Sequence, residues 1–490
     1  MRYIITAIIA SLLLFGLLPA FTEENPHITI VYPKDNSNIS APATFLVGNT
    51  EPKSQLTINN KPVKIYTNGG FVQVVNLNMG VNTINIQSAL EGKQTSVSYN
   101  LNRVNISEIS NYPVITNYKT PIWVEITKDY AVIRSTPNGD RLTPMPQGIK
   151  LQAIAKNDDS YKFKMGNRAY AWISAKDVKL LPLKKYSVKN SVSNITSTSD
   201  TDSTTIKINL SNKLPISIEQ ISKPQMTLIV HGVKTNPKLS DYTYNDDFIN
   251  SINVSQLYDD IFKIVITPKT KQFWGYKYYY EGNTLVLKLR KPPHVDVACP
   301  LKDKTITVDP GHGGLETGAM GPTGIPEKDI NLAIAEFLKT KLINAGAKVI
   351  MTRESDVDVD LYKRVDIANA NNSQVLISIH NNALPDGKNP YIEHGSSTYY
   401  YYPQSLPLAE SIQKSLVQCL GFKDYGIYSK SLVLTRTNEP IAVLAEVGFM
   451  IYPDEYNLLI QKDFQEKAAD AIYSGLVNFY LSNAENSNKK

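Results

Sequence analysis

The sequence has few cysteines and only a small excess of positive charge. Two cysteines, Cys299 and Cys419, occur in 490 residues, which excludes a disulfide scaffold as the main source of stability. The two thiols could form one bridge or stay independent, and the sequence leaves both open. The formal net charge of +6 is spread thinly. There is no basic run of the kind that binds nucleic acid, so we expect no nucleic-acid partner.

Long apolar runs are absent beyond the N-terminus. There, a basic start at Met1-Arg2 precedes an apolar run over residues 3–18 that ends in Pro19-Ala20. This order predicts a secretory signal peptide over residues 1–21. An uncleaved anchor is the alternative, but a full membrane span needs about 20 apolar residues. We therefore expect an exported protein, in the periplasm, the cell wall or the medium, with no stable transmembrane segment after cleavage.

The upstream part of the chain has a β-rich pattern. Short alternating segments separated by Asn and Gly turns predict a small sandwich over residues 27–105. Residues 118–183 continue this pattern as a small barrel, with Trp172 as an expected core residue. Residues 184–293 form a third β-rich region. It opens with a Ser/Thr-rich stretch that is either a linker or a solvated hairpin.

The third region also contains an aromatic cluster. Such a cluster could stack on sugars, but aromatic side chains more commonly fill the space between strands, and the sequence leaves the choice open. Its members are Trp274, Tyr276, Tyr278, Tyr279 and Tyr280.

The pattern changes after the linker "RKPPHVDV". Over residues 302–484, apolar strand runs such as "TITVDP" and "VLISIH" alternate with helical patterns, the first over residues 329–345. Strands separated by helices indicate an α/β domain with a mostly parallel sheet flanked by helices. The predicted fold is therefore a C-terminal α/β catalytic domain preceded by several small all-β domains.

Metal-ligand residue types follow the strands of this α/β domain. His312 follows "TVDP", His380 closes "VLISIH", and Glu446 lies near the end of a third strand, while Glu327 opens the first helix. Ligands bind beyond the carboxyl ends of strands in open α/β sheets, so these four side chains are expected to meet. Two imidazoles and one carboxylate suit zinc and leave a coordination position for water. Each residue alone is more often structural, so the prediction depends on their joint placement.

Several longer motifs make the resemblance to a known family specific. "VDPGHGG", "GAMGPTGIPEKDINL", "ISIHNNA" and "PIAVLAEVGFM" occur in this order. They resemble the zinc domain of N-acetylmuramoyl-L-alanine amidases of the amidase 3 type. The resemblance implies that His312, Glu327 and His380 bind one Zn²⁺ and that Glu446 is the catalytic carboxylate. The implied substrate is peptidoglycan, cut between N-acetylmuramic acid and L-alanine during wall remodelling or daughter-cell separation.

Other positions match the family less closely. Arg364 and Asn382 fall on recurrent family positions; Arg364 is either structural, substrate-orienting or part of an ion pair on the helix surface. Tyr425 and Thr435 stand where many relatives have arginine, and Arg436 follows one place later. These departures bear on substrate preference rather than on the reaction.

The upstream regions resemble modules that accompany wall enzymes. Residues 27–105 resemble an Ig-like sandwich, residues 118–183 an SH3-like barrel and residues 184–293 an AMIN-like β-domain. The resemblance implies that they bind the wall or space the enzyme. Two other functions stay open at this point: a different zinc hydrolase of the wall, such as a peptidase or deacetylase, and a non-catalytic wall-binding protein.

Overall fold

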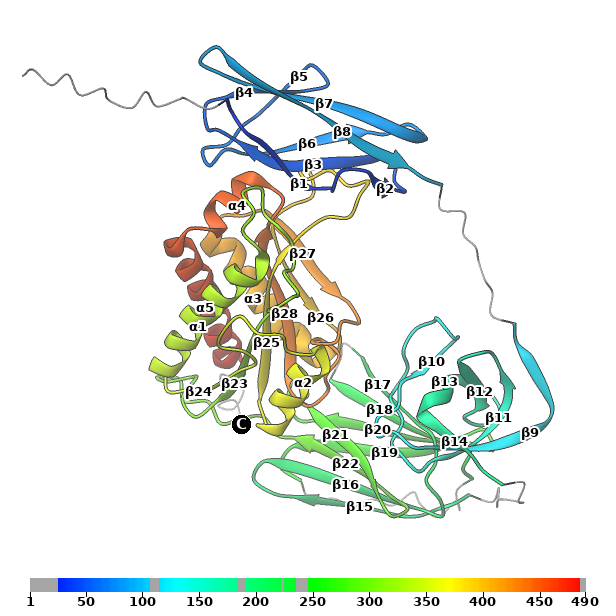
Figure 1. Cartoon of the computed structure of the whole chain (residues 1–490). Helices are drawn as coiled ribbons and strands as arrows, with labels where there is room; N and C mark the ends of the chain where they lie inside the picture. The colour runs from blue at the N-terminus through cyan, green and yellow to red at the C-terminus, as the bar shows by residue number, and fades with distance from the viewer. Residues whose placement is uncertain (1–24, 106–113, 183–189, 222–223, 235–245, 485–490) are drawn as a thin grey trace, which may run out of the picture.

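The computed structural model describes residues 25–105, 114–182, 190–221, 224–234 and 246–484 (Figure 1). The predicted signal peptide over residues 1–21 lies outside these ranges. Among the described helices, none combines the length and apolarity that a membrane crossing requires. Cys299 and Cys419 are not joined to each other.

The first module, residues 28–103, consists of two sheets packed face to face. Their strand orders are β1-β3-β6 and β2-β8-β7-β4-β5, and apolar side chains such as Leu46, Phe71 and Ile86 fill the space between them. The strands are β1 Ile28–Tyr32, β2 Ser37–Ile39, β3 Ala43–Thr50, β4 Gln55–Ile58, β5 Lys61–Val63, β6 Gly70–Asn76, β7 Gly80–Leu90 and β8 Lys93–Arg103.

The second module, residues 116–180, is one six-stranded sheet of order β10-β13-β12-β11-β9-β14. Trp172 on β13 is buried. A single-turn 3-10 helix, η1 Ala175–Asp177, precedes the last strand. The strands are β9 Thr116–Ile126, β10 Ile133–Arg134, β11 Lys150–Lys156, β12 Ser160–Lys164, β13 Tyr170–Ser174 and β14 Val178–Leu180.

The third module, residues 192–290, has two four-stranded sheets, β15-β16-β22-β21 and β17-β18-β20-β19. The Ser/Thr-rich stretch forms the hairpin β15–β16. One continuous apolar core joins the second and third modules, so the two form one unit. The strands are β15 Val192–Ser199, β16 Ser203–Leu210, β17 Ile216–Ile221, β18 Gln225–His231, β19 Ile249–Leu257, β20 Ile261–Pro268, β21 Tyr276–Glu281 and β22 Thr284–Arg290.

The C-terminal domain confirms the predicted α/β class. Its sheet has the order β24-β23-β25-β28-β26-β27; the first four strands are mutually parallel, and β26 runs antiparallel to β28. The strands are β23 Thr305–Pro310, β24 Lys348–Met351, β25 Val375–Asn382, β26 Ser396–Tyr400, β27 Asp424–Ser429 and β28 Ile441–Phe449.

Helices cover the two faces of this sheet unequally. Helices α1, α3 and α5 pack on one face through the main apolar core, while α2 covers part of the other (Figure 1). The helices are α1 Glu327–Asn344, α2 Leu361–Ala370, η2 Pro403–Ser405, α3 Leu406–Leu420, α4 Pro453–Leu459 and α5 Lys462–Ala484. The site described below lies on the same face as α2, at the carboxyl ends of the parallel strands.

The third module is fixed to the C-terminal domain by the aromatic cluster. Trp274 lies in the core of that domain, with its ring 5.3 Å from the ring of Phe479 and 5.8 Å from that of Tyr480. Tyr276 and Tyr278 are also buried. These three aromatic side chains therefore pack between elements and offer no face to a sugar.

The first module lies over the carboxyl edge of the catalytic sheet (Figure 1). Tyr32 Oη donates to Asp386 Oδ1 at 2.8 Å, and the hydroxyl of Thr44 donates to the same oxygen. Tyr391 Oη donates to the carbonyl of Val72 at 2.6 Å. A shared apolar cluster accompanies these bonds and comprises Phe45, Val47, Val72, Phe449 and Ile451. The module is thus docked on the loops that follow β25 and β28.

Replacing Asp386 should loosen this docking. Asp386→Ala leaves the hydroxyls of Tyr32 and Thr44 without their acceptor, which should weaken the interface by about 1–3 kcal/mol. We expect faster amide hydrogen exchange in residues 384–391, measured by mass spectrometry. Asp259→Ala, at a largely exposed aspartate of the third module, is the control. Equal exchange in both variants would show that Asp386 does not hold the interface.

Candidate metal centre

The turn after β23 carries the first histidine. The strand is buried almost throughout, and His312 follows it with a φ of 60°, a conformation that side-chain-bearing residues seldom adopt. Gly311 has to be glycine, because a Cβ there would lie 2.2 Å from Cε1 of His380. The turn thus brings the imidazole of His312 to a centroid distance of 4.9 Å from that of His380, which lies on the neighbouring parallel strand β25.

Glu327 joins the two histidines. It is the first residue of α1, where the helix dipole favours a negative charge. Its Oε2 lies 3.2 Å from Nε2 of His312 and its Oε1 lies 3.0 Å from Nδ1 of His380. One ligand-type atom from each residue lies within 4.8 Å of the others. The structure therefore brings these three predicted residues together.

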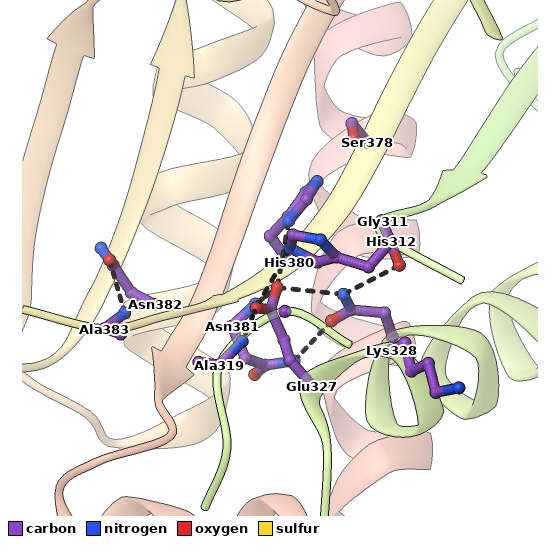
Figure 2. A network of polar contacts seen from close by, with 12 residues as sticks. Gly311, His312, Ala319, Glu327, Lys328, Ser378, His380, Asn381, Asn382 and Ala383 are labelled. Atoms are coloured by element: carbon purple, nitrogen blue, oxygen red, sulfur yellow. Dashed lines mark hydrogen bonds and ion pairs between the residues drawn. The ribbon is translucent and has the colours of Figure 1, made fainter. Parts of the chain in front are cut away.

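The carboxylate of Glu327 is held in place by neighbouring donors (Figure 2). The amide of Ala319 donates to Oε2 at 2.9 Å, and the amide of Asn381 donates to Oε1 at 3.1 Å. Asn331 Nδ2 donates to Oε1 at 3.0 Å, and its own oxygen accepts from Asn381 Nδ2 at 2.8 Å. This buried network leaves Glu327 little freedom to turn away from the histidines.

The charges of the three residues depend on one another. Burial opposes ionisation of Glu327, but hydrogen bonds from His312 and His380 outweigh it and hold the pKa of Glu327 well below its usual value. Burial likewise disfavours a charged His380, yet the contact with Glu327 raises the pKa of His380 to about 8. The site is therefore built to pair a carboxylate with positive charge.

Glu446 lies beside the three ligands but outside their group. On β28 it is the register partner of His380 on β25 and of Ser397 on β26. Its Oε2 is buried and has no hydrogen-bond partner among the described residues. Burial raises the pKa of Glu446 to about 8. A carboxyl group with a buried, unpartnered oxygen next to the imidazole of His380 is suited to exchange protons with a third molecule.

Arg364 lies beneath the histidine turn. It is buried, and its guanidinium donates to Asp309 Oδ1 at 2.9 Å, to the Pro310 carbonyl at 2.8 Å and to the His312 carbonyl at 2.8 Å. These bonds fix the backbone that presents His312. We therefore propose a structural role for Arg364.

Asn382, unlike Arg364, makes no hydrogen bond with the histidine turn within the described residues. Its side-chain oxygen accepts from the amide of Ala383 at 2.8 Å, and Figure 2 shows it directed away from the cluster. Its role as a substrate-orienting residue stays a prediction.

Sequence reasoning missed the two asparagines that support Glu327. Asn331 lies four residues after Glu327 and so shares its face of α1, which is a usable signal. Asn381 follows His380 directly, and its part depends on its backbone amide, for which the side-chain pattern gives no sign. Gly318 was missed as well: a Cβ there would lie 2.4 Å from Glu327 Oε2 and 2.6 Å from Cδ2 of His312.

The geometry agrees with the comparisons with known proteins. The family model described as N-acetylmuramoyl-L-alanine amidase matches residues 306–478. The chain is 36% identical over 197 residues to the uncharacterized protein YqiI of Bacillus subtilis, covering 40% of this chain and 93% of that protein. It is also 36% identical over 185 residues to the N-acetylmuramoyl-L-alanine amidase LytC of the same organism, covering 37% of this chain and 36% of LytC.

A third relative is matched over most of its length. The germination-specific N-acetylmuramoyl-L-alanine amidase of Bacillus subtilis is 34% identical over 208 residues, covering 38% of this chain and 84% of that protein. All three matches span less than half of this chain. Together with the family model, this extended match shows that the chain belongs to the N-acetylmuramoyl-L-alanine amidase family.

Proposed function

We propose that this protein hydrolyses the amide bond between N-acetylmuramic acid and L-alanine in peptidoglycan, using one zinc ion held by His312, Glu327 and His380. The observation that carries the proposal is the convergence of three ligand atoms within 4.8 Å, next to the partnerless oxygen of Glu446. Membership of the amidase family supports the choice of bond.

The residues present fit a zinc ion. Two imidazole nitrogens and one carboxylate oxygen are the donor set of a catalytic rather than a structural zinc site. Gly311 and Gly318 keep side-chain atoms out of the space around these donors. Two of the three ligands are also oriented by a further contact, as zinc ligands usually are: Asn331 holds Glu327, and Arg364 holds the backbone of His312.

The chain's own residues account for proton transfer. A bound zinc ion supplies Lewis acidity, which makes water nucleophilic near neutral pH and polarises a carbonyl. Glu446 removes the proton from the attacking water and delivers it to the departing amine of L-alanine. Its raised pKa suits both tasks, because a carboxyl group that titrates near the working pH accepts and releases a proton readily. A dication nearby would lower that pKa from about 8 towards neutrality.

We propose that the upstream modules belong to the same wall-directed function. Predicted export would place the enzyme with its substrate outside the membrane. The Ig-like, SH3-like and AMIN-like assignments of the three modules stay predictions. A role in wall remodelling or daughter-cell separation is consistent with an enzyme that separates stem peptides from glycan strands.

Replacing the proposed base should separate zinc binding from catalysis. Glu446→Gln keeps the shape of the side chain but cannot take up a proton, so turnover should fall by about 10²–10⁴-fold. Zinc content, measured by atomic absorption, should stay near one ion per chain. Digestion of purified peptidoglycan is followed by mass spectrometry of the new termini.

The products distinguish the proposal from its alternatives. The wild-type protein should free L-alanine amino termini from lactyl groups. Cuts between amino acids would indicate a peptidase, and acetate release would indicate a deacetylase. Wild-type turnover by Glu446→Gln would refute the role of Glu446.

Replacing a ligand should remove the metal. In His380→Ala, one imidazole donor is lost, and zinc should no longer be retained at one ion per chain. At a free zinc concentration 100 times the dissociation constant, binding stabilises a protein by about 2.7 kcal/mol. Zinc should therefore raise the melting temperature of the wild-type protein and of Glu446→Gln, but not that of His380→Ala. The same upward shift in all three would place the zinc site elsewhere.

A further inference from the structure

Three basic side chains lie near Tyr362, where the second module approaches the C-terminal domain. Arg141, from the second module, donates through Nη2 to Tyr362 Oη at 3.4 Å. Tyr362 lies in the first turn of α2 and is 53% exposed. The pKa of Tyr362 is lowered, mainly by the hydrogen bond from Arg141. The positive charges of Arg141, Arg436 and Lys128 lower it further.

The cluster lacks a counter-ion. Burial, followed by the nearby charge of Arg141, lowers the pKa of Arg436. Within the part of the chain that the structure describes, Arg141, Arg436 and Lys128 have no carboxylate oxygen within 4.0 Å. Other cations of the C-terminal domain are paired, such as Lys328 with Asp356 at 2.6 Å and Arg364 with Asp309 at 2.9 Å. Arg436 Nη1 donates to the carbonyl of Ser431 at 2.8 Å and to its hydroxyl at 3.2 Å, which are neutral acceptors. Positive charges held together without a carboxylate favour the binding of an anion.

The cluster lies on the same face of the sheet as the metal centre. Leu434, two residues before Arg436, packs with Leu376 and Ala442 under α2. Because side chains alternate along a strand, Leu376 shares its face of β25 with His380, and Ala442 shares its face of β28 with Glu446.

Helix α2 carries one residue of each site, and the two side chains point to different sides of the helix. Tyr362 is two residues from Arg364, whose Nη2 donates to the carbonyl of His312 at 2.8 Å.

An exposed segment leads from the metal centre towards the cations. Leu315, three residues after His312, is 91% exposed. Its amide donates to Asp358 Oδ1 at 2.9 Å, which places it next to the segment that enters α2. Val357 and Leu361 on that segment are exposed too. Exposed carboxylates of Asp356, Asp358 and Asp360 alternate with these apolar side chains, so the segment from the histidine turn to Tyr362 presents both kinds of group.

We propose that Arg141, Arg436 and Lys128 form a subsite for a carboxylate of the stem peptide. This rests on the proposed function, in which the stem peptide is the amine side of the scissile bond. The stem peptide begins with L-alanine and carries free carboxylates, whereas the glycan side offers a neutral amide and hydroxyls. A guanidinium matches a carboxylate with two parallel hydrogen bonds. The second module thus supplies two residues of the substrate site, Arg141 and Lys128.

The test compares two soluble muramoyl peptides, one with free stem carboxylates and one with the same carboxylates amidated. In full-length Arg141→Ala and Arg436→Ala, KM for the free-carboxylate substrate should rise about ten-fold, the loss expected for one charge-assisted contact. The kcat for the free-carboxylate substrate should stay within about two-fold of the wild-type value. KM and kcat for the amidated substrate should stay within the same limit. Arg141→Lys keeps the positive charge but cannot form the two parallel hydrogen bonds of a guanidinium. Its KM for the free-carboxylate substrate should therefore lie between those of the wild type and Arg141→Ala.

Arg168→Ala is the matched control, since Arg168 is an arginine of the second module that stacks on Tyr258. It should leave KM unchanged for both substrates. Equal losses on both substrates in Arg141→Ala would show a structural effect and overturn the subsite. An unchanged KM on the soluble substrates, with weaker binding only to walls that carry phosphate polymers, would assign the cluster to those polymers instead. Failure of the proposed function is distinguishable, because the wild-type enzyme would then release no L-alanine amino termini.

Discussion

The buried contact of Glu327 with His312 and His380 is the constraint on which the rest of the site depends. A carboxylate in this position is costly unless positive charge and hydrogen bonds compensate for it. The structure provides both: two imidazoles at 3.2 and 3.0 Å and three donors from Ala319, Asn331 and Asn381. The strained turn at His312 follows from the same need. A divalent cation between these ligands would satisfy the arrangement most fully.

The sequence predicted the C-terminal fold because its signals are local and strong. Apolar strand runs alternate with helical patterns, and this alternation indicates a parallel sheet. It also places His312, His380 and Glu446 at one edge, since parallel strands end on the same side. The helix predicted over residues 329–345 occupies Glu327–Asn344. The short helix α4 was not expected, because its seven residues carry too little periodicity to be recognised.

What the sequence could not predict depends on contacts between distant segments. Arg364 is charged and its position in a helix suggested a surface ion pair as readily as a buried support; only the fold shows it beneath the histidine turn. The docking of the first module through Tyr32 and Asp386 joins residues 354 positions apart. The contact between Arg141 and Tyr362 also crosses two domains. Such pairs leave no periodic signal, and the modules would otherwise be taken for independent spacers.

The position of the metal tests the central claim most directly. Crystals of the full-length protein grown with zinc would be measured at X-ray energies just above and just below the zinc absorption edge. The account predicts one anomalous peak per chain that disappears below the edge and is contacted by His312, Glu327 and His380, with Glu446 nearby but not bound. A peak at another group, such as the pair His394 and Glu455, or no peak at full zinc occupancy in solution, would contradict it.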